Sequence, residues 1–169
     1  MKEIIYNYDY LNEEDITKYV KRAKMVVENS KGELLLVYSH KNYFLIGGHV
    51  EENESFDECI VREIKEEAGV EIPYEKRSPF LSIKYLCKDY PNENENTKYI
   101  SNYYSIKYDL IPNLDNIDLT LDEIDGHFKL EYIDKNIVVD ILTKSLETCT
   151  KPNVIKDTIE AIQEYLKNN

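Results

Sequence analysis

The stretch GGHVEENESFDECIVREIKEEAGV, from Gly47 to Val70, decides the fold class expected of this 169-residue chain. Ser55 and Glu58 have the spacing of a capping box, which predicts a helix that begins at about Phe56. Gly69 is expected to end this helix, because glycine takes up the left-handed backbone conformation at little cost. A glycine-rich turn followed by a capped helix is therefore the central element of the predicted structure.

Three glutamates of this helix do not lie on its solvent-exposed face. At about 100° per residue, the apolar face of the helix contains Cys59, Ile60, Ile64 and Ala68. Glu63 and Glu67 fall within the same apolar arc and Glu66 falls at its edge, whereas Arg62 is expected to point toward water. An ordinary solvated acidic face therefore does not explain these three carboxylates.

Their spacing requires a compensating positive charge. Side chains at i, i+3 and i+4 lie about 5–6 Å apart, where like charges repel by about 3 kcal/mol per pair at an effective dielectric constant of about 20. Arg62 is expected to pair with one carboxylate and cannot offset all three. Mg²⁺ prefers carboxylate oxygens and shares them with phosphates, and Gly47-Gly48 lets the backbone come close to a metal or phosphate. The sequence thus predicts a site for Mg²⁺, with Mn²⁺ as a substitute.

The rest of the chain favours an α/β fold in one domain over residues 1–169. Hydrophobic residues make up 42% and charged residues 32%, which is typical of a globular protein. Strands are expected in three segments of 19–46 and over 80–90, 99–110 and 128–133, with helices over 134–146 and about 153–167. The predicted core face of strand 99–110 consists of Ile100, Tyr104, Ile106, Tyr108 and Leu110. The C-terminal helix is amphipathic and is a candidate surface for a homodimer.

Charge and cysteine content exclude several classes of protein. The net charge is −12 and no basic stripe is visible, which argues against binding to a nucleic-acid duplex. No apolar run has the length of a membrane span and no secretory signal is visible, so no membrane association is expected. The three cysteines lie far apart, which suits a reducing compartment and predicts a cytoplasmic location.

The stretch 48–70 resembles the Nudix box, which reads Gly, five residues, Glu, seven residues, Arg-Glu-aliphatic-x-Glu-Glu-x-Gly-aliphatic. The matching residues are Gly48, Glu54, Arg62, Glu63, Ile64, Glu66, Glu67, Gly69 and Val70. This resemblance implies an α/β/α sandwich around a mixed β-sheet, here with an extra C-terminal helix. It also implies a hydrolase that cleaves a nucleoside diphosphate linked to another group.

The resemblance also implies a role for each residue of the box. The implied metal ligands are Glu63, Glu66, Glu67 and the Gly48 carbonyl. Glu63, Glu66 or a residue outside the box would deprotonate the attacking water. Arg62 would orient the glutamates, Glu54 would brace the loop, and Gly47 and Gly69 would support it. The chain departs from many members at Ile46 and Asn53, where they have proline and glycine; Asn53 should keep the loop, because asparagine tolerates a left-handed backbone.

Residues outside the box carry weaker signals. Arg22 and His49 are candidates for contacts with phosphates, and Arg22 is as well explained as a surface arginine. Tyr99 and Tyr103 lie on the other face of their strand and are candidates to stack on a base, or to pack in the interior. Glu123 lies with Asp122 where some members of the family place an additional carboxylate.

The leading prediction is a metal-dependent, MutT-like pyrophosphohydrolase of a nucleoside triphosphate. Other small-molecule substrates stay open: ADP-ribose, sugar nucleotides and dinucleoside polyphosphates. A nucleotide-sensing module without catalysis is the alternative from another class. A diphosphate isomerase and a merely structural acidic helix are further alternatives.

Overall fold

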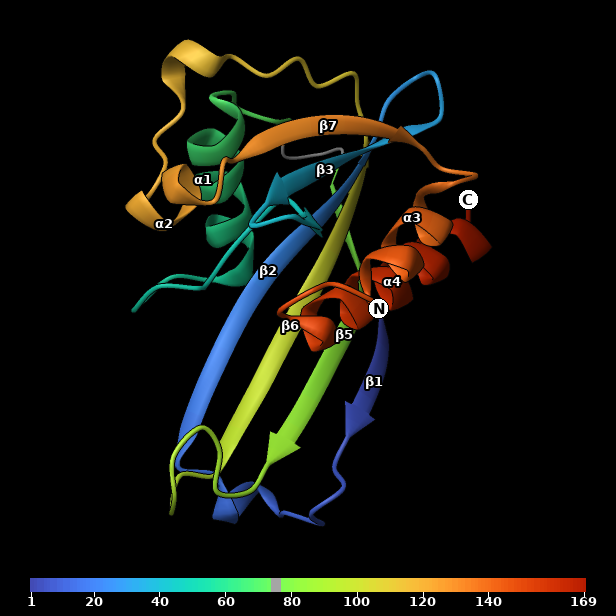
Figure 1. Cartoon of the computed structure of the whole chain (residues 1–169). Coiled ribbons are helices and arrows are strands. Elements are labelled where there is room, and N and C mark those ends of the chain that lie inside the picture. Colours follow the sequence, from blue (N-terminus) through green and yellow to red (C-terminus); the bar gives the residue numbers. More distant parts are fainter. Residues whose placement is uncertain (74–76) are drawn as a thin grey trace.

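The computed structural model describes residues 1–73 and 77–169, and its elements follow the order drawn in Figure 1. The strands are β1 (Lys2–Tyr6), β2 (Lys18–Glu28), β3 (Glu33–Ser39), β4 (Asn42–Leu45), β5 (Ser78–Cys87), β6 (Thr97–Lys107) and β7 (Lys129–Asp134). The helices are α1 (Phe56–Ala68), α2 (Leu121–Asp125), α3 (Val138–Ser145) and α4 (Pro152–Lys167), with short 3-10 turns at Glu13–Asp15 and Leu114–Asn116. The strands predicted between residues 19 and 133 are confirmed.

The strands form one mixed sheet in the order β1-β5-β6-β2-β3-β4, with β7 paired to β3. The long strands β2 and β6 run parallel in unbroken register, from Lys18 opposite Thr97 to Glu28 opposite Lys107. β1 and β5 are also parallel, and the other pairs are antiparallel. In Figure 1, α1 lies on one side of the long strands and α3 and α4 lie on the other. The architecture is therefore an α/β/α sandwich, as predicted.

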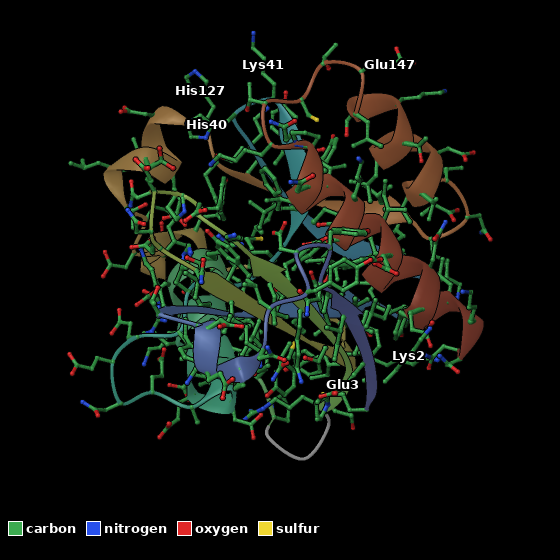
Figure 2. All side chains as sticks on the ribbon, turned by 90° about the horizontal axis from the view of Figure 1, so that it is seen from below. Lys2, Glu3, His40, Lys41, His127 and Glu147 are labelled. Carbon is green, nitrogen blue, oxygen red and sulfur yellow. The ribbon has the colours of Figure 1, made fainter. Side chains whose placement is uncertain are left out.

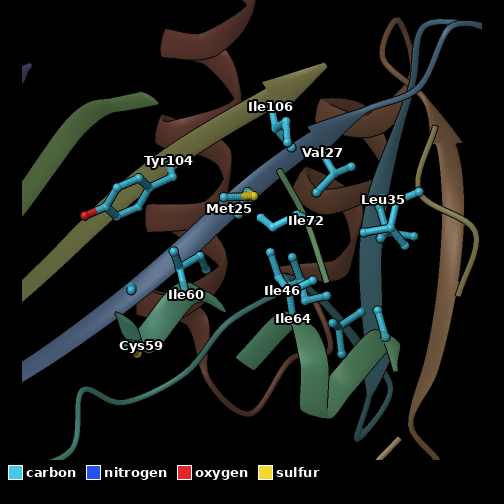
Figure 3. Packing of buried hydrophobic residues seen from close by; sticks show 14 residues of the cluster. Met25, Val27, Leu35, Ile46, Cys59, Ile60, Ile64, Ile72, Tyr104 and Ile106 are labelled. Atoms are coloured by element: carbon cyan, nitrogen blue, oxygen red, sulfur yellow. The ribbon is translucent and has the colours of Figure 1, made fainter. Parts of the chain in front are cut away.

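Both faces of the sheet are buried, and alternate residues of β2 point to opposite faces. Met25 and Val27 pack with Ile60 and Ile64 of α1, and Met25 and both isoleucines have no exposed surface (Figure 3). Val26 faces the other way, into a second cluster that α3 and α4 cover. Period-two alternation is what a pleated strand requires when both of its faces are covered.

The second covered face corrects the prediction for strand β6. Tyr104, Ile106 and Leu110 are buried under α1, as expected for the predicted core face. Tyr103 on the other face is also buried, with 3% of its surface exposed, because α4 packs over it. β1 was not predicted, and α3 begins later than expected because β7 extends through Asp134.

The segment after β4 positions the candidate site. β2 pairs with β3 only near its end, where Glu28 lies opposite Leu34. Toward the start of β2, the segment 46–50 pairs with β2 in place of β3. Met25 N–H donates to Ile46 O and Ala23 N–H donates to Gly48 O, both at 3.0 Å. This pairing fixes the glycine pair and His49 against β2. Within the described residues, no helix is long and apolar enough to cross a membrane.

Candidate functional site

The two ends of α1 are held as the sequence predicts. Ser55 Oγ accepts the N–H of Glu58 at 3.2 Å, and the Glu58 carboxylate accepts the N–H of Ser55 at 2.8 Å. Gly69 ends the helix with φ of 69°. Because Ile60 and Ile64 are anchored in the core, the rotation of the helix is fixed. Its carboxylates at 63 and 67 therefore face the glycine turn and are buried.

The glycine turn fits closely against these carboxylates. Gly47 has φ of 118°, and its N–H donates to Glu67 Oε2 at 2.8 Å. A Cβ atom at Gly48 would overlap the carboxylate of Glu63. Only glycine therefore allows this approach of backbone to helix. The Gly48 carbonyl, a predicted metal ligand, accepts the N–H of Ala23 in this conformation.

Arg62 lies over the acidic residues, which corrects the expectation that it points toward water. Its side chain is 25% exposed. Nη1 contacts Glu63 Oε1 and Glu66 Oε2, both at 2.9 Å, and Nε and Nη2 bind the carboxylate of Glu54 at 2.9 and 3.0 Å. One arginine thus bridges three carboxylates, where one was expected. These contacts raise the pKa of Arg62 and lower the pKa of Glu54.

Lys24 is a component of the site that the sequence analysis missed. It stands on β2 and its ammonium group donates to the Gly47 carbonyl. Burial lowers the pKa of Lys24, and the charges of Glu67 and Glu63 oppose that effect. Lys24 lies on the same strand face as the buried Val26, so the sequence indicates a charged residue on a buried face. The sequence does not show which residues Lys24 contacts.

Burial dominates the electrostatics of the two inner glutamates. It raises the pKa of Glu67 to about 8, against the attraction of Lys24 and the N–H of Gly47. Burial also raises the pKa of Glu63, although Arg62 and Lys24 favour its ionised form. Two carboxylates held in this way make a site that a further cation would stabilise.

The donor set fits a hard divalent cation in chemistry, and its side chains are engaged with protein partners in this conformation. The carboxylates of Glu63, Glu66 and Glu67 offer only oxygen atoms, as Mg²⁺ prefers. Arg62 holds two of them and Gly47 holds the third. Across residues 1–73 and 77–169, no three Asp, Glu, His or Cys side chains are arranged to enclose a metal ion. Arg62 Nη1 holds one oxygen of Glu63 and one of Glu66, so the second oxygen of each is the one not bound to Arg62.

A second segment forms the opposite wall of this site. The pocket beside the glycine turn has a volume of about 520 Å³, and residues from 118–123 line it together with the turn and α1. Glu123, the predicted additional carboxylate, is among them. It caps α2 by accepting the N–H of Thr120 at 2.7 Å. The N–H of Asp118 donates to Glu66 O at 2.8 Å, which ties this wall to α1.

The remaining candidates divide into two groups. Arg22 Nε lies 3.1 Å from His49 Nε2, and the Arg22 guanidinium lies 5.7 Å from the centre of the Tyr99 ring, so these three are brought together. Tyr103 is excluded, because its ring is buried under α4 and offers no face to a base. The other two histidines of the chain, His40 and His127, are exposed at the margin of the molecule (Figure 2).

The family follows from a match over most of the chain. Residues 18–125 match the model of the NUDIX domain, and this range contains the whole box. The chain belongs to the NUDIX family. It is accordingly a Nudix hydrolase, a class of enzyme that acts on nucleotide derivatives and generally uses a divalent metal. No curated protein sequence is significantly similar to it.

Solved structures show the same fold in other Nudix proteins. The dihydroneopterin triphosphate pyrophosphohydrolase of E. coli has a TM-score of 0.58 and 14% identity, over 88% of this chain and 96% of that chain. A NUDIX hydrolase from Nitrosomonas europaea has a TM-score of 0.59 and 14% identity, over 88% and 89%. A MutT protein from Bacillus halodurans has a TM-score of 0.53 and 18% identity, over 72% of each chain. At these identities the likeness establishes the fold and leaves the substrate open.

Proposed function

We propose that this Nudix hydrolase is a Mg²⁺-dependent pyrophosphohydrolase of a nucleoside triphosphate or a closely related derivative, with Mn²⁺ as a substitute. The observation that carries the proposal is the set of three carboxylates, Glu63, Glu66 and Glu67, beside the glycine turn. Two of them are buried, Arg62 bridges Glu63 and Glu66, and the N–H of Gly47 holds Glu67. The proposed metal ligands are Glu63, Glu66, Glu67 and the Gly48 carbonyl. When bound, the metal would neutralise the phosphates and lower the pKa of the attacking water.

Each protein group has a role that its contacts support. Glu67 is fixed by the N–H of Gly47, so its carboxylate keeps one orientation. Either Glu63 or Glu66 takes the proton from the attacking water, and Arg62 Nη1 holds one oxygen of each. Glu54 holds the other side of the Arg62 guanidinium and thereby sets its position. Lys24 places a positive charge beside the turn that would receive the phosphates.

The test is a screen for release of phosphate and pyrophosphate, with Mg²⁺ and then Mn²⁺. The panel contains nucleoside triphosphates, dihydroneopterin triphosphate, ADP-ribose, sugar nucleotides and dinucleoside polyphosphates. Glu67→Gln keeps the size of the side chain and removes its charge, so it should lower kcat/KM by about a hundredfold or more. Glu71→Gln is the matched control, because Glu71 is exposed and pairs only with Lys65 among the described residues.

The outcomes separate the competing functions. Turnover of triphosphates that Glu67→Gln loses and Glu71→Gln keeps is the expected result. Turnover of ADP-ribose, sugar nucleotides or dinucleoside polyphosphates alone would replace the proposed substrate class. Saturable nucleotide binding with no turnover under either metal would identify a sensing module instead.

A further inference from the structure

A second cavity lies on the α4 side of the sheet, next to the acidic site. Its volume is about 510 Å³, and it lies between β2, β5, β6 and the first two turns of α4. The lining residues that matter here are Arg22, Tyr85, Tyr90, Tyr99, Asn153 and Asp157. We call this space the tyrosine cavity. None of the residues of the Nudix box lines it.

The wall formed by β6 and the loop that precedes it is aromatic and suits a flat ring. The rings of Tyr90 and Tyr99 lie 6.1 Å apart at an angle of 57°. The guanidinium of Arg22 covers the Tyr99 ring at 5.7 Å from its centre. Tyrosine faces and a planar guanidinium both stack favourably on heteroaromatic rings.

The opposite wall, formed by α4, carries groups that form hydrogen bonds. Tyr85 donates to Asp157 Oδ1 at 2.6 Å. Among the described residues, Asp157 Oδ2 accepts no hydrogen bond that would compete with a ligand. Asn153 lies four residues earlier on α4, hence on the same side of the helix, and lines the same cavity. A carboxylate accepts two adjacent N–H groups, and an amide beside it can donate to a carbonyl oxygen.

A positively charged boundary separates the tyrosine cavity from the acidic pocket beside the glycine turn. Arg22 belongs to the cavity and His49 belongs to the acidic pocket, and the two side chains lie 3.1 Å apart. Burial lowers the pKa of His49, and the positive charges of Arg22, Lys24 and Lys151 lower it further. From α4 toward α1, the surroundings therefore change from aromatic, to cationic, to acidic. This order matches a base, its phosphates and their metal ion.

We propose that the tyrosine cavity binds the base of the substrate, and that Asp157 and Asn153 select a 2-amino-4-oxopyrimidine edge, as in guanine or a pterin. The adjacent ring N–H and amino group of that edge would face Asp157, and its oxo group would face Asn153. Adenine has an acceptor where guanine has the ring N–H, so it would meet the carboxylate with a repulsive pair. The inference rests on the proposed function for the place of the phosphates, and it adds the identity of the base.

The test measures binding without hydrolysis, by calorimetry in the presence of a chelator of divalent ions. The probes are GMP, AMP, CMP, UMP and neopterin monophosphate. The wild type should prefer GMP or neopterin monophosphate to AMP, and the comparison of these two distinguishes the sources of the shared edge. Asp157→Asn keeps an acceptor for Tyr85 and loses the second acceptor for the base. It should weaken the binding of the preferred ligand by about ten- to hundredfold and leave AMP unchanged or tighter.

Two further variants serve as controls for the effect of Asp157→Asn. Glu160→Gln is the matched control: it makes the same change on α4, at a residue that accepts from Tyr6 and does not line the cavity, and it should keep the preference. Tyr99→Ala should weaken the binding of every base, because it removes a stacking surface and leaves the hydrogen-bonding groups of Asp157 and Asn153 in place. Equal binding of all bases, no binding of any, or a preference that survives Asp157→Asn would overturn the inference. Base preference with no turnover in the hydrolase screen would overturn only the proposed function.

Discussion

Asp157 gives a prediction about stability that is independent of catalysis. Burial raises the pKa of this carboxyl to about 6, and the nearby charge of Glu160 adds to the effect. The hydrogen bond from Tyr85 and the charge of Arg22 act in the opposite direction. A carboxyl that binds its proton more tightly in the folded chain makes folding less favourable once it is ionised. Asp157→Asn removes this ionisation and keeps the shape of the side chain.

The magnitude follows from the size of the shift. The pKa rises from an ordinary value of 3.8 to about 6, and about two pKa units correspond to about 3 kcal/mol. This penalty is absent below about pH 4, grows as the pH rises to about 6, and is complete above it. Relative to Asp157→Asn, the wild type should therefore lose about 3 kcal/mol of its free energy of unfolding between about pH 4 and pH 7.

Urea unfolding of both proteins across this pH range measures the difference directly. All other titrating groups are shared by the two proteins, so their contributions cancel in the comparison. Glu160→Gln in the wild-type background should lower the pKa of Asp157, because it removes a neighbouring negative charge. The pH range over which the wild type loses stability should then move to lower pH. A difference between wild type and Asp157→Asn that stays constant from pH 4 to pH 7 would refute the reasoning.

Three further perturbations test the core, a buried hydrogen bond to a carboxylate and the glycine turn. Met25→Ala should lower the free energy of unfolding in urea by about 2–5 kcal/mol, because Met25 is fully buried between the sheet and α1; a loss near zero would contradict this packing. Tyr165→Phe removes the hydroxyl that donates to Glu28 Oε2 at 2.5 Å and should cost about 1.5–3 kcal/mol in the same assay; an unchanged midpoint would show that Glu28 is satisfied without it. Gly48→Ala places a Cβ atom on the carboxylate of Glu63 and should lower kcat/KM by about a hundredfold; wild-type turnover would mean that the turn adjusts freely.

Those features of the site that depend on residues close together in the sequence could be predicted from the sequence. The capping box at Ser55 depends on residues three apart, and the end of α1 depends on one glycine. Asn53 was expected to tolerate a left-handed backbone, and it has φ of 65°. The helical wheel also placed Glu63 and Glu67 correctly on the apolar side, where both are buried. Each of these statements needs only the geometry of one helix and its ends.

Contacts between distant segments were beyond the same reasoning. A helical wheel gives the direction of a Cβ atom, and the long side chain of Arg62 bends back from that direction toward three carboxylates. Lys24 meets Gly47 only because the segment after β4 pairs with β2. Alternation along β6 separated its two faces, but it did not show that α4 would cover Tyr103. In each case the missing information was which element packs on which.

The distribution of charge shows how a protein with a net charge of −12 can hold a polyanion. The expectation that no basic stripe exists concerned a surface long enough for a nucleic-acid duplex. A single nucleotide needs only a few cations at one place. Arg22 and Lys24 on β2 and Lys151 before α4 all act on His49, beside the glycine turn. These cations come from segments more than a hundred residues apart in the sequence, so only the folded chain brings them together. The same folding places Asp157 at the far end of this cationic boundary, where it can distinguish one base from another.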